Sequence, residues 1–250
     1  GSTDESEASP SAEPSVMPSA APETETGEDD AAPTPSAAPE NGGLTASPDT
    51  LAAPIADEGF TWDAETKTLT ITAGTGDYTT STVSSRPYDA YKSQATKIVV
   101  DGNADTVVGS YAFYQFNNVE ELEIKQCGDI KNYAFNFCSK LRTVNITACG
   151  NIGDRAFGQT RALETVTIGT CGDFDVYVFQ NASKLRTLKI GTCGSFHKDT
   201  FQSARNLESV EIDRCGDIGN SAFSGQTKLT TVVLGECGNI GDKAFSGCSA

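Results

Sequence analysis

Six cysteines recur at a constant interval of 22 residues, and this interval most strongly constrains what the chain can fold into. They are Cys127, Cys149, Cys171, Cys193, Cys215 and Cys237, and a glycine follows each one. Seven phenylalanines, from Phe113 to Phe245, keep the same interval. A period of roughly 20–50 residues is typical of stacked units that cannot bury an apolar face alone. We therefore predict a repeat solenoid over residues 105–250.

The residues before each cysteine alternate between apolar and polar. In Leu141-x-x-Val144-x-Ile146-x-x-Cys149, polar Asn145 separates the two β-branched residues. A period of two is typical of a strand with one buried face, and the spacing is the core of a leucine-rich repeat. We expect each unit to add one short parallel strand to the concave face of the solenoid.

The other half of each unit has a different spacing. Ile152, Ala156, Phe157 and Leu163 recur at offsets of four, five and eleven residues, closer to a helical stripe. A polar residue that could cap a short turn lies two positions before the alanine, as in Asn132, Asp154, Asn220 and Asp242. The pattern predicts short helical or 3-10 turns on the outer face.

Stacking the units places equivalent residues in columns about 4.8 Å apart. The phenylalanines should then pack ring on ring, each ring contributing roughly 1.5–3 kcal/mol. The residue after the repeat leucine alternates in charge, because the column reads Glu120, Arg142, Glu164, Arg186, Glu208 and Thr230. We expect neighbouring charges in this column to pair across the rungs.

The first 58 residues are of another kind. They hold 13 acidic residues, nine of the ten prolines and no Lys or Arg, so they carry 13 of the 16 net negative charges. Such a composition cannot bury enough apolar surface to offset the entropy of ordering. We predict a disordered Pro/acidic linker over residues 1–58. The chain also lacks an apolar run of the length that spans a membrane.

Residues 59–104 do not follow the period. Trp62, Leu69 and Ile71 alternate with polar residues, which indicates a hairpin with one buried face. Because the end of a solenoid needs a cover, we interpret this segment as an N-terminal β-hairpin cap. The stretch 98–100 would be the first strand of repeat type.

Taken together, these motifs resemble the BspA-like leucine-rich repeats of bacteria. Units of that family have an Ile-Gly-x-x-Ala-Phe centre, a Cys, and then Leu-x-x-Val-x-Ile; here residues 152–157 and 240–245 match the centre. The resemblance covers about residues 59–250. It implies an exported, surface-displayed protein, with some family members implicated in adhesion to host proteins, and it carries over no catalytic residue.

The eight cysteines allow three interpretations: disulfides, a metal site or core packing. There is no C-x-x-C motif and His197 is the only histidine, so zinc has little support. Parallel Cβ atoms about 4.8 Å apart lie outside the roughly 3.5–4.5 Å disulfide range. We favour free, buried thiols. Cys138 and Cys248 lie outside the column and cannot pair with each other.

Two further features have a structural and a functional interpretation. A polar column one step after the glycine suggests either a calcium ladder or, as we prefer, local turn chemistry; it comprises Asp129, Asn151, Asp173, Ser195, Asp217 and Asn239. In two neighbouring units, Phe174 and Phe196 replace the usual isoleucine. We favour mutual repacking there over a recognition patch, which would comprise Asp175, Tyr177, His197 and Lys198.

The outward strand positions vary while the core columns do not, which favours a binding module. Together with what the resemblance implies, we expect a protein-binding or adhesion module of a secreted or cell-surface protein. The candidate ligand-binding residues of the concave face are Glu121, Glu123, Lys125, Asn145, Thr167, Lys189, Glu211, Asp213 and Val233. These positions include no aromatic anchor of the kind that dominates hot spots. The alternative is a structural stalk or spacer of a larger surface protein.

The remaining expectations concern partners and location. We expect a host or cell-surface protein or a glycan as partner, no nucleic acid, no enzyme activity, no cofactor and no metal. We expect an extracellular or cell-surface location, tethered through the linker. The last unit stops before its strand, so we also expect the strand ending near Leu234 to be an edge open to self-association.

Overall fold

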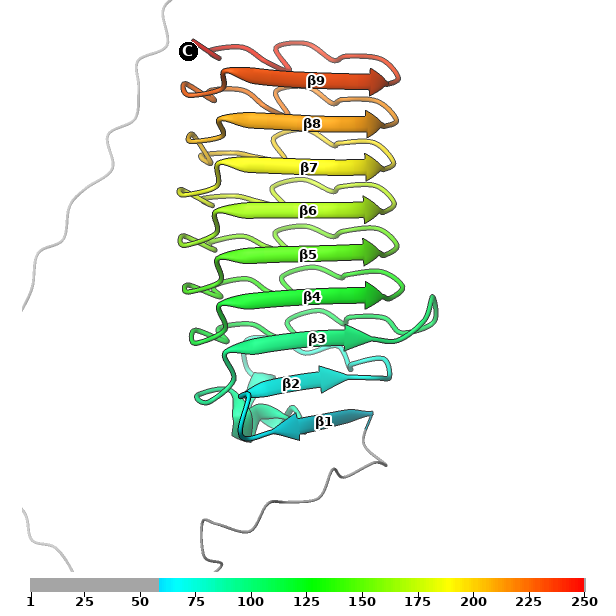
Figure 1. The fold of residues 1–250 in the computed structure, drawn as a ribbon, viewed down its shortest axis with the longest axis vertical. Coiled ribbons are helices and arrows are strands. Elements are labelled where there is room, and N and C mark those ends of the chain that lie inside the picture. Colours follow the sequence, from blue (N-terminus) through cyan, green and yellow to red (C-terminus); the bar gives the residue numbers. More distant parts are fainter. Residues whose placement is uncertain (1–58, 250) are drawn as a thin grey trace, which may run out of the picture. The chain divides into compact units, whose positions relative to one another are not determined.

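The computed structural model describes residues 59–249, and the linker predicted for residues 1–58 lies outside this range. The strands form one nine-stranded sheet, in which they follow one another in sequence order (Figure 1). They are β1 (Phe60–Asp63), β2 (Thr68–Ile71), β3 (Lys97–Asp101), β4 (Glu121–Gln126), β5 (Thr143–Ala148), β6 (Thr165–Thr170), β7 (Thr187–Thr192), β8 (Ser209–Arg214) and β9 (Thr231–Glu236). No helix among residues 59–249 is long and apolar enough to cross a membrane.

The repeat strands stack in parallel with a constant register. Val144 of β5 pairs with Leu122 of β4 on one side and with Val166 of β6 on the other, so each step covers 22 residues. Along β5 the buried residues Val144 and Ile146 flank exposed Asn145. The predicted leucine-rich repeat solenoid, with one short parallel strand per unit, is confirmed.

The phenylalanine column forms the centre of the core behind the sheet. From Phe113 to Phe245, successive rings stack with their centroids 4.8–5.5 Å apart. The two irregular units add a second stack, because the rings of Phe174 and Phe196 lie parallel with centroids 4.6 Å apart. The two phenylalanines that replace the usual isoleucine therefore pack against each other. This contact supports mutual repacking as the reason why these two units differ from the others.

The hairpin covers the first rung as predicted. β1 and β2 are antiparallel, and β2 then pairs in parallel with β3. Leu69 and Ile71 are buried, while Trp62 is half-buried and stacks on Tyr91 with ring centroids 4.8 Å apart. Two short 3-10 helices, η1 (Val83–Ser85) and η2 (Asp89–Tyr91), complete the cap between β2 and β3.

The outer turns differ from the prediction, because no helix or 3-10 helix forms within residues 105–249. Each full repeat turn contains residues with positive φ, such as Tyr133 at 58° and Phe137 at 62°. Left-handed backbone ends a right-handed helix. The N–H groups donate to the next rung instead; that of Phe135, for example, lies 2.8 Å from the oxygen of Ala156. The backbone N–H groups that a helix would use within its own turn are therefore bonded to the next rung.

The residues predicted to cap these turns also act between rungs. Oδ1 of Asn132 accepts the backbone N–H of Asp154 at 3.0 Å. Oδ1 of Asn220 accepts that of Asp242 at the same distance. The predicted local capping is therefore wrong for both asparagines, since their partner lies one full repeat further along the chain.

The alternating charge column pairs largely as predicted. Arg142 lies between two acids, with Nε 3.8 Å from Glu120 and Nη1 3.1 Å from Glu164. Further along, Arg186 is 3.5 Å from Glu208. Thr230 ends the column by donating its hydroxyl to the backbone oxygen of Glu208 at 3.1 Å. These side chains are all well exposed, so each pair contributes at most about 1 kcal/mol.

Candidate functional site

The solvent-facing side of β3–β9, here called the sheet face, carries the nine residues predicted to bind a ligand. Six of them form one register column across six strands: Glu123, Asn145, Thr167, Lys189, Glu211 and Val233. Glu121 lies in the neighbouring column, opposite Thr143. Lys125 and Asp213 lie two positions beyond that central column on β4 and β8. The structure therefore brings all nine predicted residues to one surface.

The charges of the sheet face are paired near both ends of the solenoid. Nζ of Lys97 lies 2.9 Å from both Glu121 and Glu123. The hydrogen bonds that Lys97 donates to these carboxylates, that to Glu123 first, raise the pKa of Lys97. Towards the other end, Lys189 lies 3.5 Å from Glu211. Exposed pairs of this kind set the surface pattern and contribute little stability.

The middle of the sheet face is uncharged. β5 and β6 present Asn145 and Thr167 in the central column, with Thr143 and Thr165 beside them. These hydroxyl and amide groups can donate and accept hydrogen bonds. The face is therefore suited to a polar partner and offers no apolar anchor at its centre.

The polar column after each glycine forms a ladder between rungs. Oδ1 of Asp129 accepts the N–H of Asn151 at 2.7 Å, and Oδ1 of Asn151 accepts that of Asp173 at 2.9 Å. The ladder continues to Asn239. These oxygens serve the backbone of the next rung, so the local turn chemistry that we preferred does not describe their role.

This ladder explains why a glycine precedes each polar residue. A Cβ on Gly150 would lie 2.3 Å from Oδ1 of Asp129, far inside van der Waals contact. Gly172 would meet Asn151 in the same way, at 2.2 Å. The side chain of one rung thus crosses the backbone of the next at a position where only glycine leaves room.

All eight cysteines are free thiols in the structure. Within the column, Cys149 lies between Cys127 and Cys171, and hydrogen bonds from both thiols lower the pKa of Cys149. The same interactions raise the pKa of Cys127 and of Cys171. Cys138, outside the column, is fully buried, and this burial raises the pKa of its thiol to about 12.

The outer turns carry an aromatic ladder that the sequence analysis missed. The rings of Tyr111 and Tyr133 stack with centroids 4.8 Å apart. The guanidinium of Arg155 then lies over Tyr133 at 5.8 Å and over Tyr177 at 4.5 Å. These four residues share the 22-residue interval, which was the available signal, and all have positive φ, between 50° and 60°. Tyr and Arg are the residue types most enriched in binding hot spots.

Arg155 is held in this ladder by a neighbouring acid. Its Nη1 lies 2.7 Å from Oδ2 of Asp154. Burial raises the pKa of Asp154, although the charge of Arg155 opposes this shift. The arrangement fixes the guanidinium between two tyrosine rings and leaves the ladder half-buried at the surface.

Known proteins with the same repeat permit a family assignment. The model of the BspA-type leucine-rich repeat region matches in six copies, over residues 91–186 and 151–250. This chain belongs to the BspA-type leucine-rich repeat family. That family is a type of surface-protein module. No curated protein matches the sequence.

Two solved structures are similar to this BspA-type chain. The leucine-rich repeat protein of T. pallidum is 15% identical with a TM-score of 0.44, and the match covers 71% of this chain and 90% of that one. A leucine-rich cell surface protein from Faecalibacterium prausnitzii A2-165 is 21% identical with a TM-score of 0.46. That match covers 71% of this chain and 52% of the other, so this chain spans about half its length.

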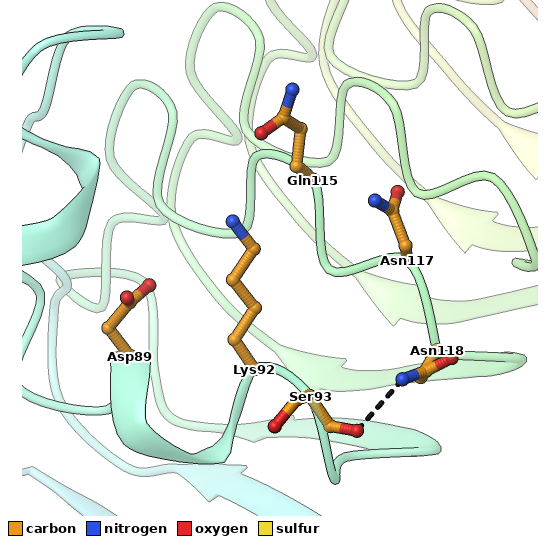
Figure 2. Close-up of a pocket in the computed structure, with 6 residues that line it drawn as sticks. All are labelled: Asp89, Lys92, Ser93, Gln115, Asn117 and Asn118. Atoms are coloured by element: carbon orange, nitrogen blue, oxygen red, sulfur yellow. Dashed lines mark hydrogen bonds between the residues drawn. The ribbon is translucent and has the colours of Figure 1, made fainter.

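A polar hollow lies where the cap of the BspA-type solenoid meets its first rung (Figure 2). Asp89, Lys92 and Ser93 approach from the cap, and Gln115, Asn117 and Asn118 from the first outer turn. Nδ2 of Asn118 donates to the backbone oxygen of Ser93 at 2.8 Å. The hollow contains amides, a hydroxyl and two charges, a set that can hold a small polar ligand but contains no nucleophile–base pair.

His197 lies in the irregular part of the repeats. Its Nδ1 is 3.4 Å from Oδ1 of Asp175, and both side chains are exposed. Lys198 and Val176 line a surface depression with it, next to buried Phe196. Three groups of the suggested recognition patch, Asp175, His197 and Lys198, therefore lie close together. The Phe174–Phe196 stack, however, accounts for why these two units differ.

Proposed function

We propose that this BspA-type solenoid is the binding module of a bacterial cell-surface protein and that its sheet face contacts a protein or glycan partner. One observation carries the proposal: the nine outward residues that vary between units lie in adjacent columns of one surface. The core behind them repeats Leu, Val, Ile and Phe with little variation. Solenoid binding proteins are expected to combine a regular apolar core with a variable polar surface that contacts the partner.

Charge favours the end of the sheet face near β8 as the first place to test. Asp213 is exposed on β8, and Glu211 lies two positions before it on the same face. Lys189, the cation 3.5 Å from Glu211, is itself largely exposed. A partner with basic groups can therefore compete for both carboxylates.

The second candidate function is a structural spacer. Its support is that charges of the sheet face already pair with one another, at Lys97–Glu121, Lys125–Asp101 and Lys189–Glu211. A surface whose charges already pair with one another gains less free energy on binding a partner, because binding would have to break existing ion pairs. The spacer would then hold another part of a larger surface protein away from the cell.

The test is a double charge reversal, Glu211→Lys with Asp213→Lys, measured on a panel of immobilised extracellular-matrix proteins and glycans. The matched control is Glu65→Lys with Asp105→Lys, which changes the net charge equally at two exposed loop positions. We expect the sheet-face variant to lose at least tenfold in affinity, or about 1.4 kcal/mol, while the control binds like the wild type. Equal losses in both variants would show a general charge effect and contradict the proposed site on the sheet face. No binding by the wild type would favour the spacer.

A third variant locates the surface within the molecule. Tyr133→Ala with Tyr177→Ala removes the aromatic ladder on the outer turns and leaves the sheet face unchanged. If this variant alone loses binding, the partner contacts the turns, and the proposed site on the sheet face is wrong while the proposed binding function stands.

A further inference from the structure

The six cysteines of the column occupy the same position in successive rungs, a regularity that packing in the core does not by itself require. Each cysteine directly follows a strand. In the first five, a backbone hydrogen bond joins it to the next rung: the N–H of Cys127 donates to Ala148 O at 3.1 Å and that of Cys149 to Thr170 O at 3.0 Å. The same bond recurs at Cys171, Cys193 and Cys215. Six sulfur atoms are therefore held at equivalent positions, one per rung.

The column is accessible from solvent. Cys149, Cys171 and Cys237 are only half-buried, unlike the fully buried apolar columns beside them. A surface hollow opens onto Cys127 and Cys149, and the rest of its lining is largely small, including Gly128, Gly150 and Ala148. Cys127, Cys193 and Cys215 are buried, and each is a neighbour in the column of a half-buried cysteine. An ion can therefore enter the column at the half-buried cysteines without disturbing the phenylalanine column.

The spacing of the rungs decides which bond can join neighbouring sulfur atoms. Parallel strands lie about 4.8 Å apart, whereas a disulfide needs an S–S distance of about 2.05 Å and Cβ atoms about 3.8 Å apart. A zinc–thiolate bond is about 2.3 Å long, and two opposed metal–thiolate bonds of about that length span about 4.6 Å. A single ion between two rungs therefore fits the existing spacing, and a disulfide requires the rungs to move.

The donor set restricts the kind of ion. No group of three or more His, Cys, Asp or Glu side chains among residues 59–249 is arranged to hold a metal ion. Tetrahedral zinc needs four ligands, so the donor set of the column, two thiols from neighbouring rungs, favours an ion with fewer ligands. Pairs of thiolates suit soft ions such as copper(I).

We infer that the cysteine column binds soft monovalent metal ions of the copper(I) and silver(I) class, each held between thiolates of two adjacent rungs. Six thiols enclose five intervals. If every interval is filled, five ions replace six thiol protons and the inner thiolates each bridge two ions, so the chain gains only one negative charge. No electron is transferred in this exchange.

The test uses the full chain, kept reduced under anaerobic conditions, with silver(I) supplied in an excess of glutathione. Denatured protein should first show eight titratable thiols, in keeping with the free cysteines of the structure. Native mass spectrometry should then show up to five bound silver ions, and circular dichroism should be unchanged. Zinc(II) under the same conditions should not be retained.

Two serine variants make the result specific to the column. Cys171→Ser leaves three intervals between column neighbours, so bound silver should fall from five ions to three. Cys248→Ser, the matched control, removes a half-buried thiol outside the column and should leave five. The inference is overturned if silver binds equally to both variants, if it binds one ion per thiol, if glutathione prevents binding, or if binding requires unfolding.

Discussion

The two ends of the solenoid carry the same kind of rung but differ in what covers it. At the N-terminal end, buried Arg86 donates from Nη1 to the backbone oxygens of Ala112 at 3.2 Å and Tyr114 at 3.1 Å. In the interior, the equivalent oxygens of Ala134 and Asn136 accept backbone N–H groups from the preceding rung. The guanidinium of Arg86 therefore takes the place of the two backbone N–H donors that a preceding rung would supply.

The cap imitates a rung in other ways as well. Oδ1 of Asp77 accepts the N–H of Ser110 at 2.7 Å, as Asn132 does for Asp154 in the repeats. Tyr88 extends the phenylalanine column, because its ring stacks on Phe113 with centroids 5.2 Å apart. A sequence without the repeat motif thus supplies the donors, acceptors and ring that the first rung needs.

The other end of the described sheet has no such cover. On β9, Val232 is 44% exposed, and Ile240 in the following turn is 55% exposed. Val210, at the position equivalent to Val232 one rung earlier, is fully buried. The comparison shows that a repeat residue is buried by the next rung, not by its own unit.

The largest effect should come from removing the guanidinium of the cap. Arg86→Met leaves Asp89 and several backbone oxygens without their buried donor. We expect the free energy of unfolding to fall by about 3–5 kcal/mol, measured by chemical denaturation. The control Arg142→Met breaks exposed ion pairs and should cost at most about 1 kcal/mol. Equal losses would show that Arg86 has no special role at the covered end.

Removing an aromatic ring should also cost more stability at the capped end than at the open end. Tyr88→Ala removes a buried ring and should lower the free energy of unfolding by about 3 kcal/mol. Phe245→Ala removes a half-buried ring at the open end, where we expect about 1 kcal/mol. Thermal unfolding of both variants gives the comparison, and a larger loss for Phe245 would contradict it.

The open edge should govern self-association of this chain. Val232→Lys places a charge on the uncovered side of β9, where charged residues discourage strand pairing. We expect association in analytical ultracentrifugation to weaken by about tenfold, or about 1.4 kcal/mol. Thr165→Lys on the interior strand β6 is the control. An unchanged association constant for Val232→Lys would show that β9 does not mediate association.

The smallest effect concerns pH at the capped end. Hydrogen bonds from the Lys131 side chain and then from the Ser110 backbone lower the pKa of Asp77 below 3.8. Because the folded pKa is the lower one, its stabilising contribution is complete well above pH 3.8 and is lost as the pH falls through the folded value. Asp77 is exposed, so we expect under about 1 kcal/mol. Asp77→Asn should flatten this part of a Tm profile measured from pH 2 to 6, and an unchanged profile would contradict the assignment.

The constant 22-residue interval made much of the fold predictable from sequence. Because Val144 and Ile146 recur in equivalent form in every unit, the alternation predicts the strand, and the interval predicts its partner. The stacked phenylalanines and the charge column follow from the same register. The nine candidate residues share one face for the same reason, although their role in binding stays a proposal.

Features that depend on two rungs at once were not predictable in the same way. Asp129 serves the N–H of Asn151, so its role is invisible when one unit is read as a local turn. The helical spacing of the outer turns was misleading because backbone donors there bond to the next rung. Arg86 occurs once, without a periodic signal, and only the fold brings it to the first rung.

The sequence by itself therefore determined the repeat, its register, the buried columns and the family. The tertiary structure decided where the backbone hydrogen bonds go, which residue covers the first rung, and that four ladder side chains stack on the outer turns. The physical reason is that a period specifies which positions stack, while hydrogen-bond partners depend on backbone directions that only the stacked rungs define.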